Sequence, residues 1–380
     1  MKTIQELREY FPYLETGKKY FNHAAISPLP TPVKEKLDAY LKIRSEAEIE
    51  PYFLTLDQAI GAKEKLAKML GVKNKCIAWA SNVSDSLNIL AQGIRWKHGD
   101  EVILNNIEFP SNIYPFLNLK SEGVNILFAK DENGKVDLPQ IEKLITNKTK
   151  LISISMVQFL TGYRADLKEL GDLCKRKNII FCVDGIQGAG IVNIDLGECN
   201  IDFFAGGSHK WLMGLQGLGY FYISEKLLSF IEHKSIGWTS VKNPWNLLDY
   251  KLDLIENAES FQNGTLPRIA IIALNASLSF FEEIGLNRIE ERIINNAIYL
   301  KNLLTENGFQ PLLKDVGKNN LAGIISFSHS KSVEIVKKLE KKNIVCSVRE
   351  GVIRVSPHFY NSREDLDLLV EELKKIEAKK

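Results

Sequence analysis

The sequence lacks a surplus of charge of either sign. Its 380 residues include 49 lysines and arginines against 47 aspartates and glutamates, a formal net charge of +2. Lysines alternate with glutamates along the chain, so we predict no basic face of the kind that nucleic acid or an anionic membrane needs. We therefore expect neither nucleic acid nor a membrane as a partner.

Paired cysteines and long apolar runs are also missing. No apolar run approaches the roughly 20 residues of a membrane span. The opening MKTIQELREYFPYL carries Glu6, Arg8 and Glu9 where a signal peptide would be apolar, so we expect a cytoplasmic protein. The five cysteines are too far apart for a disulfide framework or a metal site such as zinc, which favours reduced thiols; they are Cys76, Cys174, Cys182, Cys199 and Cys346.

The composition is that of an ordinary globular protein, 45% hydrophobic and 25% charged. Strands that are apolar on both faces and separated by helices predict a doubly wound α/β domain with a mainly parallel sheet. From about residue 262 a long helical stretch and then strands at 323–329, 344–348 and 352–356 predict a smaller α+β domain. In the first part, strand patterns occupy 75–81, 100–106, 124–130, 151–157 and 178–184, with helical spacing at 85–96, 111–123 and 166–178.

Four residues stand near strand ends, where open parallel sheets bind their ligands. Asp184 ends one strand, Ser84 lies at a strand-to-helix turn, and Phe109 follows a strand. Each has an ordinary alternative: a turn-forming aspartate, a helix N-cap, or a core phenylalanine. Lys210 lies among small and apolar residues in FAGGSHKWLMGLQGLGYFYIS, residues 204–224. Desolvation there would lower its pKa and make the amine a better nucleophile toward a carbonyl.

These four residues together meet the demands of one cofactor. Pyridoxal 5'-phosphate needs an anion at its ring nitrogen, a cradle for its phosphate, an aromatic lid and an amine that forms an imine. Each signal is weak alone, and it is the combination that predicts this cofactor.

The order of seven segments resembles the class V aminotransferase family, which includes cysteine desulfurases, kynureninases and isopenicillin-N epimerase-like enzymes. The segments are NHAAISPLP, SNVSDSLN, EFPSN, VDGIQGAG, GGSHKWLMGLQGLGYFY, FQNGTLP and IRVSPHFYNSREDL. The resemblance runs from about residue 20 to the C-terminus. It implies the type I fold of pyridoxal-phosphate enzymes, with a large cofactor-binding domain at 20–261 and a small α+β domain from 1–19 and 262–380.

The resemblance also implies roles for single residues. Lys210 forms the imine, Asp184 pairs with the pyridinium, and Gln187 forms a hydrogen bond with the phenolic oxygen. Phe109 takes the place where desulfurases usually stack a histidine on the ring. The phosphate contacts fall to Val83 through its backbone, Ser84 and His209, and Ser208 is a further cofactor-binding residue.

Two further matches concern the partner subunit and the substrate. Thr265 matches a residue that family members lend to the phosphate of a neighbouring subunit, which implies a homodimer. Arg354 matches the arginine for the α-carboxylate of an amino-acid substrate, and His23 is a candidate at the mouth of the site. A small amino acid would react through the lysine imine and a quinonoid intermediate. Transamination, elimination and epimerisation all remain open.

Desulfuration through a persulfide is expected to be absent. Desulfurases of the family carry a mobile loop with a nucleophilic cysteine, but here SVREGVIRVS joins the two arginine-containing strands directly, and Cys346 reads as a core thiol. We therefore favour an aminotransferase or a C–S/C–N lyase over a desulfurase. A catalytically silent binding protein is a further alternative, whereas GIQGAG and GLQGLG lack the G-x-G-x-x-G order of a dehydrogenase.

Overall fold

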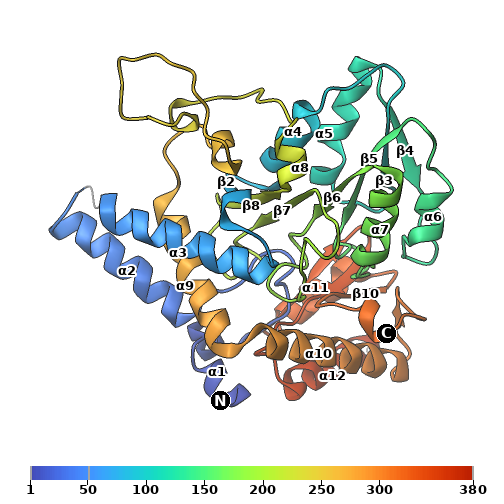
Figure 1. Ribbon diagram of the computed structural model, residues 1–380. Coiled ribbons are helices and arrows are strands. Elements are labelled where there is room, and N and C mark those ends of the chain that lie inside the picture. The colour runs from blue at the N-terminus through green and yellow to red at the C-terminus, as the bar shows by residue number, and fades with distance from the viewer. Residues whose placement is uncertain (1, 50–51, 379–380) are drawn as a thin grey trace.

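The computed structural model describes residues 2–49 and 52–378, which form a large lobe and a small lobe (Figure 1). The large lobe is built on a seven-stranded sheet in the order β2-β8-β7-β6-β5-β3-β4. All neighbouring pairs from β7 to β4 are parallel, and β8 runs antiparallel to both of its neighbours. This confirms the predicted mainly parallel α/β sheet. The strands are β2 (Ile77–Ala80), β3 (Glu101–Asn105), β4 (Asn125–Ala129), β5 (Thr149–Ser155), β6 (Ile180–Asp184), β7 (Phe203–Gly207) and β8 (Gly219–Ile223).

The central strands are apolar on both sides because each side faces its own core. Along β6, Phe181 and Val183 belong to one buried cluster, whereas Ile180 and Cys182 belong to another on the opposite face. This alternation follows from the two-residue period of a strand. The helices of this lobe are α2 (Thr31–Glu46), α3 (Tyr52–Leu70), α4 (Val83–Gly93), α5 (Tyr114–Leu117), α6 (Leu138–Glu142), α7 (Leu167–Lys177) and α8 (Glu225–Leu228). Helix α9 (Arg268–Ile284), which follows residue 262, packs against α2 and α3.

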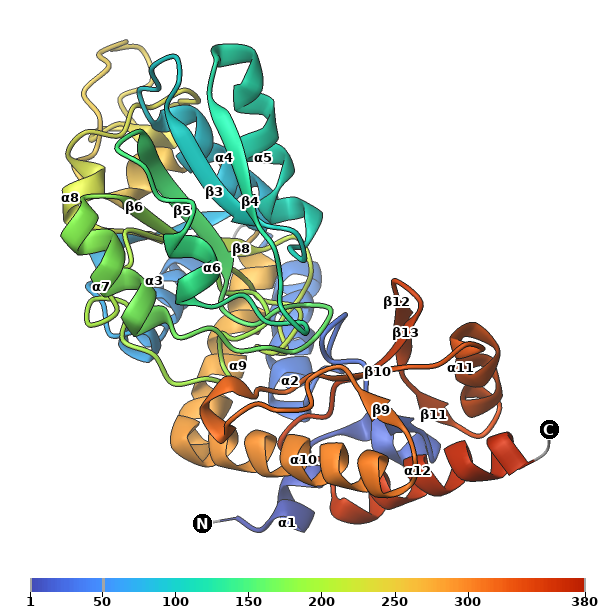
Figure 2. The same cartoon turned by 90° about the vertical axis from the view of Figure 1, so that its right-hand side faces the viewer.

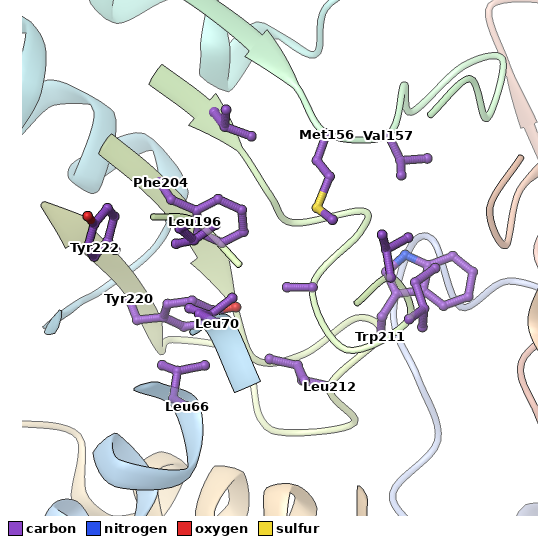
Figure 3. Close-up of a cluster of buried hydrophobic side chains, with 14 of the residues drawn as sticks. Leu66, Leu70, Met156, Val157, Leu196, Phe204, Trp211, Leu212, Tyr220 and Tyr222 are labelled. Atoms are coloured by element: carbon purple, nitrogen blue, oxygen red, sulfur yellow. The ribbon is translucent and has the colours of Figure 1, made fainter. Parts of the chain in front are cut away.

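Figure 3 shows part of one of these two cores. Phe204 on β7 and Tyr220 on β8 project into it and meet Leu66 and Leu70 from α3. The turn after β6 is equally tight, since a Cβ on Gly185 would lie 1.8 Å from the Phe204 ring. Strand ends packed this closely hold the segments that follow them in fixed positions.

One predicted helix, at 111–123, is broken into short pieces. A 3-10 turn at Pro110–Asn112 precedes α5, and a second 3-10 turn, Asn118–Glu122, ends at Gly123 with φ of 82°. Two prolines, Pro110 and Pro115, lie in or next to first turns, where the missing N–H is tolerated. The apolar spacing thus corresponds to helical turns, but not to the one continuous helix that it predicts.

The small lobe contains the antiparallel sheet β12-β13-β10-β9 and lies below the large lobe in Figure 2. The first residues of the chain join this lobe, because Arg8 makes an ion pair with Asp365 at 2.6 Å and β1 pairs with β11. The division at residues 19 and 262 stays a prediction. The elements are α1 (Ile4–Arg8), β1 (Lys19–Tyr20), α10 (Leu286–Glu306), β9 (Gln310–Pro311), β10 (Ile325–Ser328), α11 (Ser332–Glu340), β11 (Ile344–Val345), β12 (Ser347–Arg349), β13 (Val352–Val355) and α12 (Arg363–Ala378).

Within residues 2–49 and 52–378, no single helix is long and apolar enough to cross a bilayer. Helices α9 and α10 reach that length and composition only as a pair, and the chain bends by 82° between them.

Candidate active site

Lys210 lies in the connection between β7 and β8. The Ser208 hydroxyl closes this connection by donating to the carbonyls of Leu215 and Leu218, and the Gly214 N–H donates to the Ser208 carbonyl at 2.8 Å. Because Ser208 is fully buried and its hydroxyl hydrogen is used inside the loop, the geometry favours a loop-forming role over the predicted contact with the cofactor. Ser208 thus fixes the position of the backbone from which His209 and Lys210 extend.

The Lys210 amine lies 5.7 Å from the centre of the Phe109 ring. Phe109 is 43% exposed, which rules out the alternative of an ordinary core phenylalanine. Burial lowers the pKa of Lys210, and the positive charges of Arg354 and Arg349 act in the same direction, whereas Asp184 opposes them. The amine is therefore more readily neutral than that of a lysine in water.

Asp184 is the last residue of β6, Gln187 lies in the turn after it, and both are buried. Asp184 accepts a hydrogen bond from the Ile186 N–H at 3.0 Å, and burial raises its pKa. Gln187 donates to the Ala24 carbonyl at 3.0 Å and accepts from the Trp211 indole at 2.8 Å. Since a side-chain amide carries two N–H groups, one donor of Gln187 is left over for a bound group.

The start of α4 supplies an anion-binding geometry. Asn82, not Ser84, is the N-cap of this helix, since its side chain accepts from the Asp85 N–H at 2.9 Å. The N-cap alternative for Ser84 is thus wrong, and its hydroxyl instead donates to the Ser111 hydroxyl at 2.9 Å. The N–H groups of Val83 and Ser84 belong to the first helical turn, where no carbonyl of the same helix can accept them.

His209 is half-buried beside Lys210. Burial, together with the positive charge of Lys210, lowers the pKa of His209 to about 4. The ring is consequently neutral near pH 7, so it can contribute a hydrogen bond to an anion but no full charge.

Arg354 on β13 brings the small lobe into the site. Its side chain is 2% exposed, its Nη1 donates to the Phe159 carbonyl at 3.0 Å, and its Nε has no partner among the residues that the structure describes. The Phe159 ring packs edge-on against Phe109 with centroids 5.3 Å apart. Contacts therefore link Lys210, Phe109, Phe159 and Arg354 in one chain. Burial and the neighbouring Arg349 lower the pKa of Arg354 to about 9.

A buried carboxylate that the sequence did not single out, Glu108, supports this arrangement. It accepts from the Asn105 amide at 2.6 Å, the Ser155 N–H at 2.7 Å and the Gln158 amide at 2.9 Å, and also from the Ser155 hydroxyl. The strand register pairs Ser155 with Asp184. Glu108 thus ties together the ends of β3 and β5 directly before Phe109. The only sequence signal for it was a charged residue within an apolar strand end.

His23 does not lie at the mouth of the site, so this prediction is wrong. The ring is fully buried, with Nδ1 2.8 Å from the Ser356 carbonyl and Nε2 2.8 Å from the Tyr360 hydroxyl. Trp211 and His358 pack against it, and burial lowers its pKa to about 3. His23 is therefore a neutral core residue that joins the two lobes.

Thr265 is exposed in the protomer. It lines an open cavity of about 810 Å³ together with Ser81, Asn88 and Phe261, and Lys210 is not among the lining residues. Its contact with the phosphate of a partner subunit stays a prediction.

The residues around Lys210 fit pyridoxal 5'-phosphate. The polar parts of this cofactor are matched by the remaining donor of Gln187, the buried acceptor on Asp184 and the first-turn N–H groups of α4. Its flat ring is matched by the partly exposed Phe109 ring beside the amine. On a mainly parallel sheet, they define the class of type I fold pyridoxal-phosphate enzymes.

Comparison with known proteins identifies the family. The model of the class-V aminotransferase family matches residues 19–369, so the chain belongs to this family and is a pyridoxal-phosphate-dependent enzyme. A probable cysteine desulfurase of Methanothermobacter thermautotrophicus is 28% identical, with 98% of each chain covered. The uncharacterized aminotransferase YcbU of Bacillus subtilis is 25% identical, with 97% of each chain covered.

A solved structure has the same fold over nearly the whole chain. The apo cysteine desulfurase of Thermococcus onnurineus NA1 superposes with a TM-score of 0.89 at 26% identity, covering 99% of this chain and 98% of that one. This confirms the type I fold that the sequence resemblance implied.

Proposed function

We propose that the protein binds pyridoxal 5'-phosphate through Lys210 and acts on a small amino acid as an aminotransferase or a C–S/C–N lyase. The observation that carries this proposal is the position of the Lys210 amine, 5.7 Å from the Phe109 ring, with a pKa lowered by burial. A lysine in that setting is a nucleophile and a base near neutral pH.

The residues that would hold the cofactor lie at the ends of four strands, β2, β3, β6 and β7. Asp184 would pair with the ring nitrogen, Gln187 would donate a hydrogen bond to the phenolic oxygen, and Phe109 would cover the ring. The Val83 and Ser84 N–H groups, the Ser84 hydroxyl and neutral His209 would hold the phosphate. When bound, the cofactor supplies an electron sink for the carbanion of the substrate.

The remaining steps are performed by side chains of the protein. Arg354 would bind the substrate α-carboxylate, which supplies the counterion and the Nε acceptor that the guanidinium lacks. The neutral Lys210 amine would then take the α-proton of the substrate and return a proton later. Asp184, with its counter-charge, stabilises the positive form of this amine.

Persulfide-forming desulfuration is the second candidate, favoured by the relatives named probable cysteine desulfurases. Two features weigh against it. The turn between Arg349 and Val352 holds only Glu350 and Gly351, so no cysteine-bearing loop fits there. Cys346 is buried and its pKa is raised to about 12 by burial, which leaves almost no thiolate near neutral pH. Sulfur release by simple elimination stays compatible with the site.

Borohydride trapping tests the cofactor assignment. Reduction of the loaded protein followed by peptide mapping should place the pyridoxyl label on Lys210, and the Lys210→Ala variant should carry none. A matched control is Lys97→Ala, outside the site. A label on another lysine, or no label in reconstituted protein, would overturn the proposal.

Mass spectrometry after incubation with cysteine separates the two candidate activities. We expect no persulfide on the thiols of the protein. Stoichiometric persulfide on Cys346, lost together with activity in Cys346→Ala, would show that the desulfurase candidate is correct.

A further inference from the structure

A second arginine, Arg349, lies beside Arg354 on the same hairpin. Strands β12 and β13 pair Ser347 with Arg354 and Arg349 with Val352. Because side chains alternate along a strand, Arg349 is on the same face as Ser347 and therefore on the face of Arg354. Such diagonal neighbours in an antiparallel pair lie about 7–8 Å apart.

The turn at the tip holds Arg349 in place. Glu350 and Gly351 have φ values of 44° and 80°, the signs that a two-residue type I′ turn requires. Such a turn fixes the register of the two strands, so the relation between the two guanidinium groups is built into the hairpin.

Neither guanidinium has a carboxylate partner among residues 2–49 and 52–378. Arg349 donates from Nη1 to its neighbour's carbonyl, that of Val348, at 2.8 Å, and Arg354 donates to the Phe159 carbonyl. Arg349 is half-buried, and its positive charge lowers the pKa of both Lys210 and Arg354. A buried charge without a counterion is costly, so two adjacent cations of this kind would each be stabilised by an anionic group of a ligand.

We propose that Arg349 binds a second anionic group at the far end of the substrate, so that the enzyme prefers amino acids whose side chain ends in a carboxylate or another small oxyanion. This deepens the proposed function and rests on it, since Arg354 must bind the α-carboxylate. The diagonal spacing suits a short substrate with one anion for each arginine. Arg349 is then the residue that selects between charged and neutral side chains.

Titration calorimetry with unreactive dicarboxylates tests this selection. Succinate and glutarate, which have no amino group, are compared with their monoamides on the cofactor-loaded protein. The parent protein should bind each diacid about tenfold to a hundredfold more tightly than its monoamide. Arg349→Gln should abolish this preference by weakening only the diacids, and Arg349→Lys, which keeps the charge, should retain part of it. The matched control is Arg95→Gln, a surface arginine paired with Glu232.

The outcomes separate the two proposals. Equal weakening of diacids and monoamides in Arg349→Gln would mean that both arginines hold one carboxylate, and no weakening would mean that Arg349 binds nothing; either result overturns the inference. Arg354→Gln should weaken every ligand. If it leaves the monoamides unaffected, the α-carboxylate role in the proposed function fails, whatever Arg349 does.

Discussion

Arg354 should reduce the stability of the protein while no substrate is bound. The guanidinium is 2% exposed and has no counterion among the described residues, and its pKa falls from 12.5 to about 9. That fall corresponds to about 5 kcal/mol of unfavourable free energy for the charged form. Replacing Arg354 would also leave the Phe159 carbonyl without its hydrogen bond. That loss costs about 1–3 kcal/mol and offsets part of the gain. Arg354→Met, similar in length and apolar, should therefore raise the free energy of unfolding by about 2–4 kcal/mol.

The sign of the pH dependence follows from the direction of the pKa shift. Below about pH 9 the group is charged in both the folded and the unfolded states, and the full penalty for burying it applies. As the pH rises from about 9 toward 12.5 the folded state releases the proton first, so the penalty fades. The advantage of Arg354→Met should be constant near neutral pH and should shrink above pH 9.

Urea denaturation of the cofactor-loaded, substrate-free protein measures this difference. Arg164→Met is a matched control, because Arg164 makes an ion pair with Glu290 at 2.8 Å, and its removal should destabilise the fold. A parent protein more stable than Arg354→Met would refute the argument that the guanidinium is an uncompensated charge. Amino-acid binding should be lost in Arg354→Met in either case.

Three further predictions concern the cofactor. Asp184→Asn should keep the cofactor but slow α-proton exchange by orders of magnitude, and near-normal exchange measured by NMR in deuterated water would exclude its role at the ring nitrogen. The rate at which cofactor-free protein captures pyridoxal phosphate should rise with pH around a midpoint below 10.5, and Asp184→Asn should move that midpoint lower because Asp184 opposes the fall in the pKa of Lys210; an upward move would contradict this. Thr265→Ala should weaken cofactor retention about tenfold to a hundredfold in a homodimer, whereas a fully loaded monomer in analytical ultracentrifugation would refute a shared site.

Local pattern predicted the sheet and the position of its polar ends. Asp184 ends an apolar strand, and the carboxyl ends of parallel strands meet at one edge, so its place at that edge was predictable. Its nearness to Lys210 depends on β7, which lies parallel beside β6 and was not among the predicted strands. The helix at 111–123 was harder, since Pro115 can begin a helical turn as readily as it interrupts one.

His23 and Glu108 depended on contacts that local pattern does not contain. The partners of His23 lie more than 300 residues away, at Ser356 and Tyr360, so neither its burial nor its neutral state could be read from NHAAISPLP. The donors to Glu108 include Ser155 and Gln158, about fifty residues further along the chain. A charged residue in an apolar segment signals a buried network only when its donors are known.

Arg349 lies between these two cases. The sequence SVREGVIRVS is sufficient to predict that Arg349 lies near Arg354, because a two-residue turn at Glu350 and Gly351 fixes which strand positions face each other. What the sequence did not contain was that no carboxylate of the described residues pairs with either arginine, which depends on every element packed against the hairpin. Sequence therefore sets the spacing of the two cations, and the fold decides that their counterions must come from a ligand.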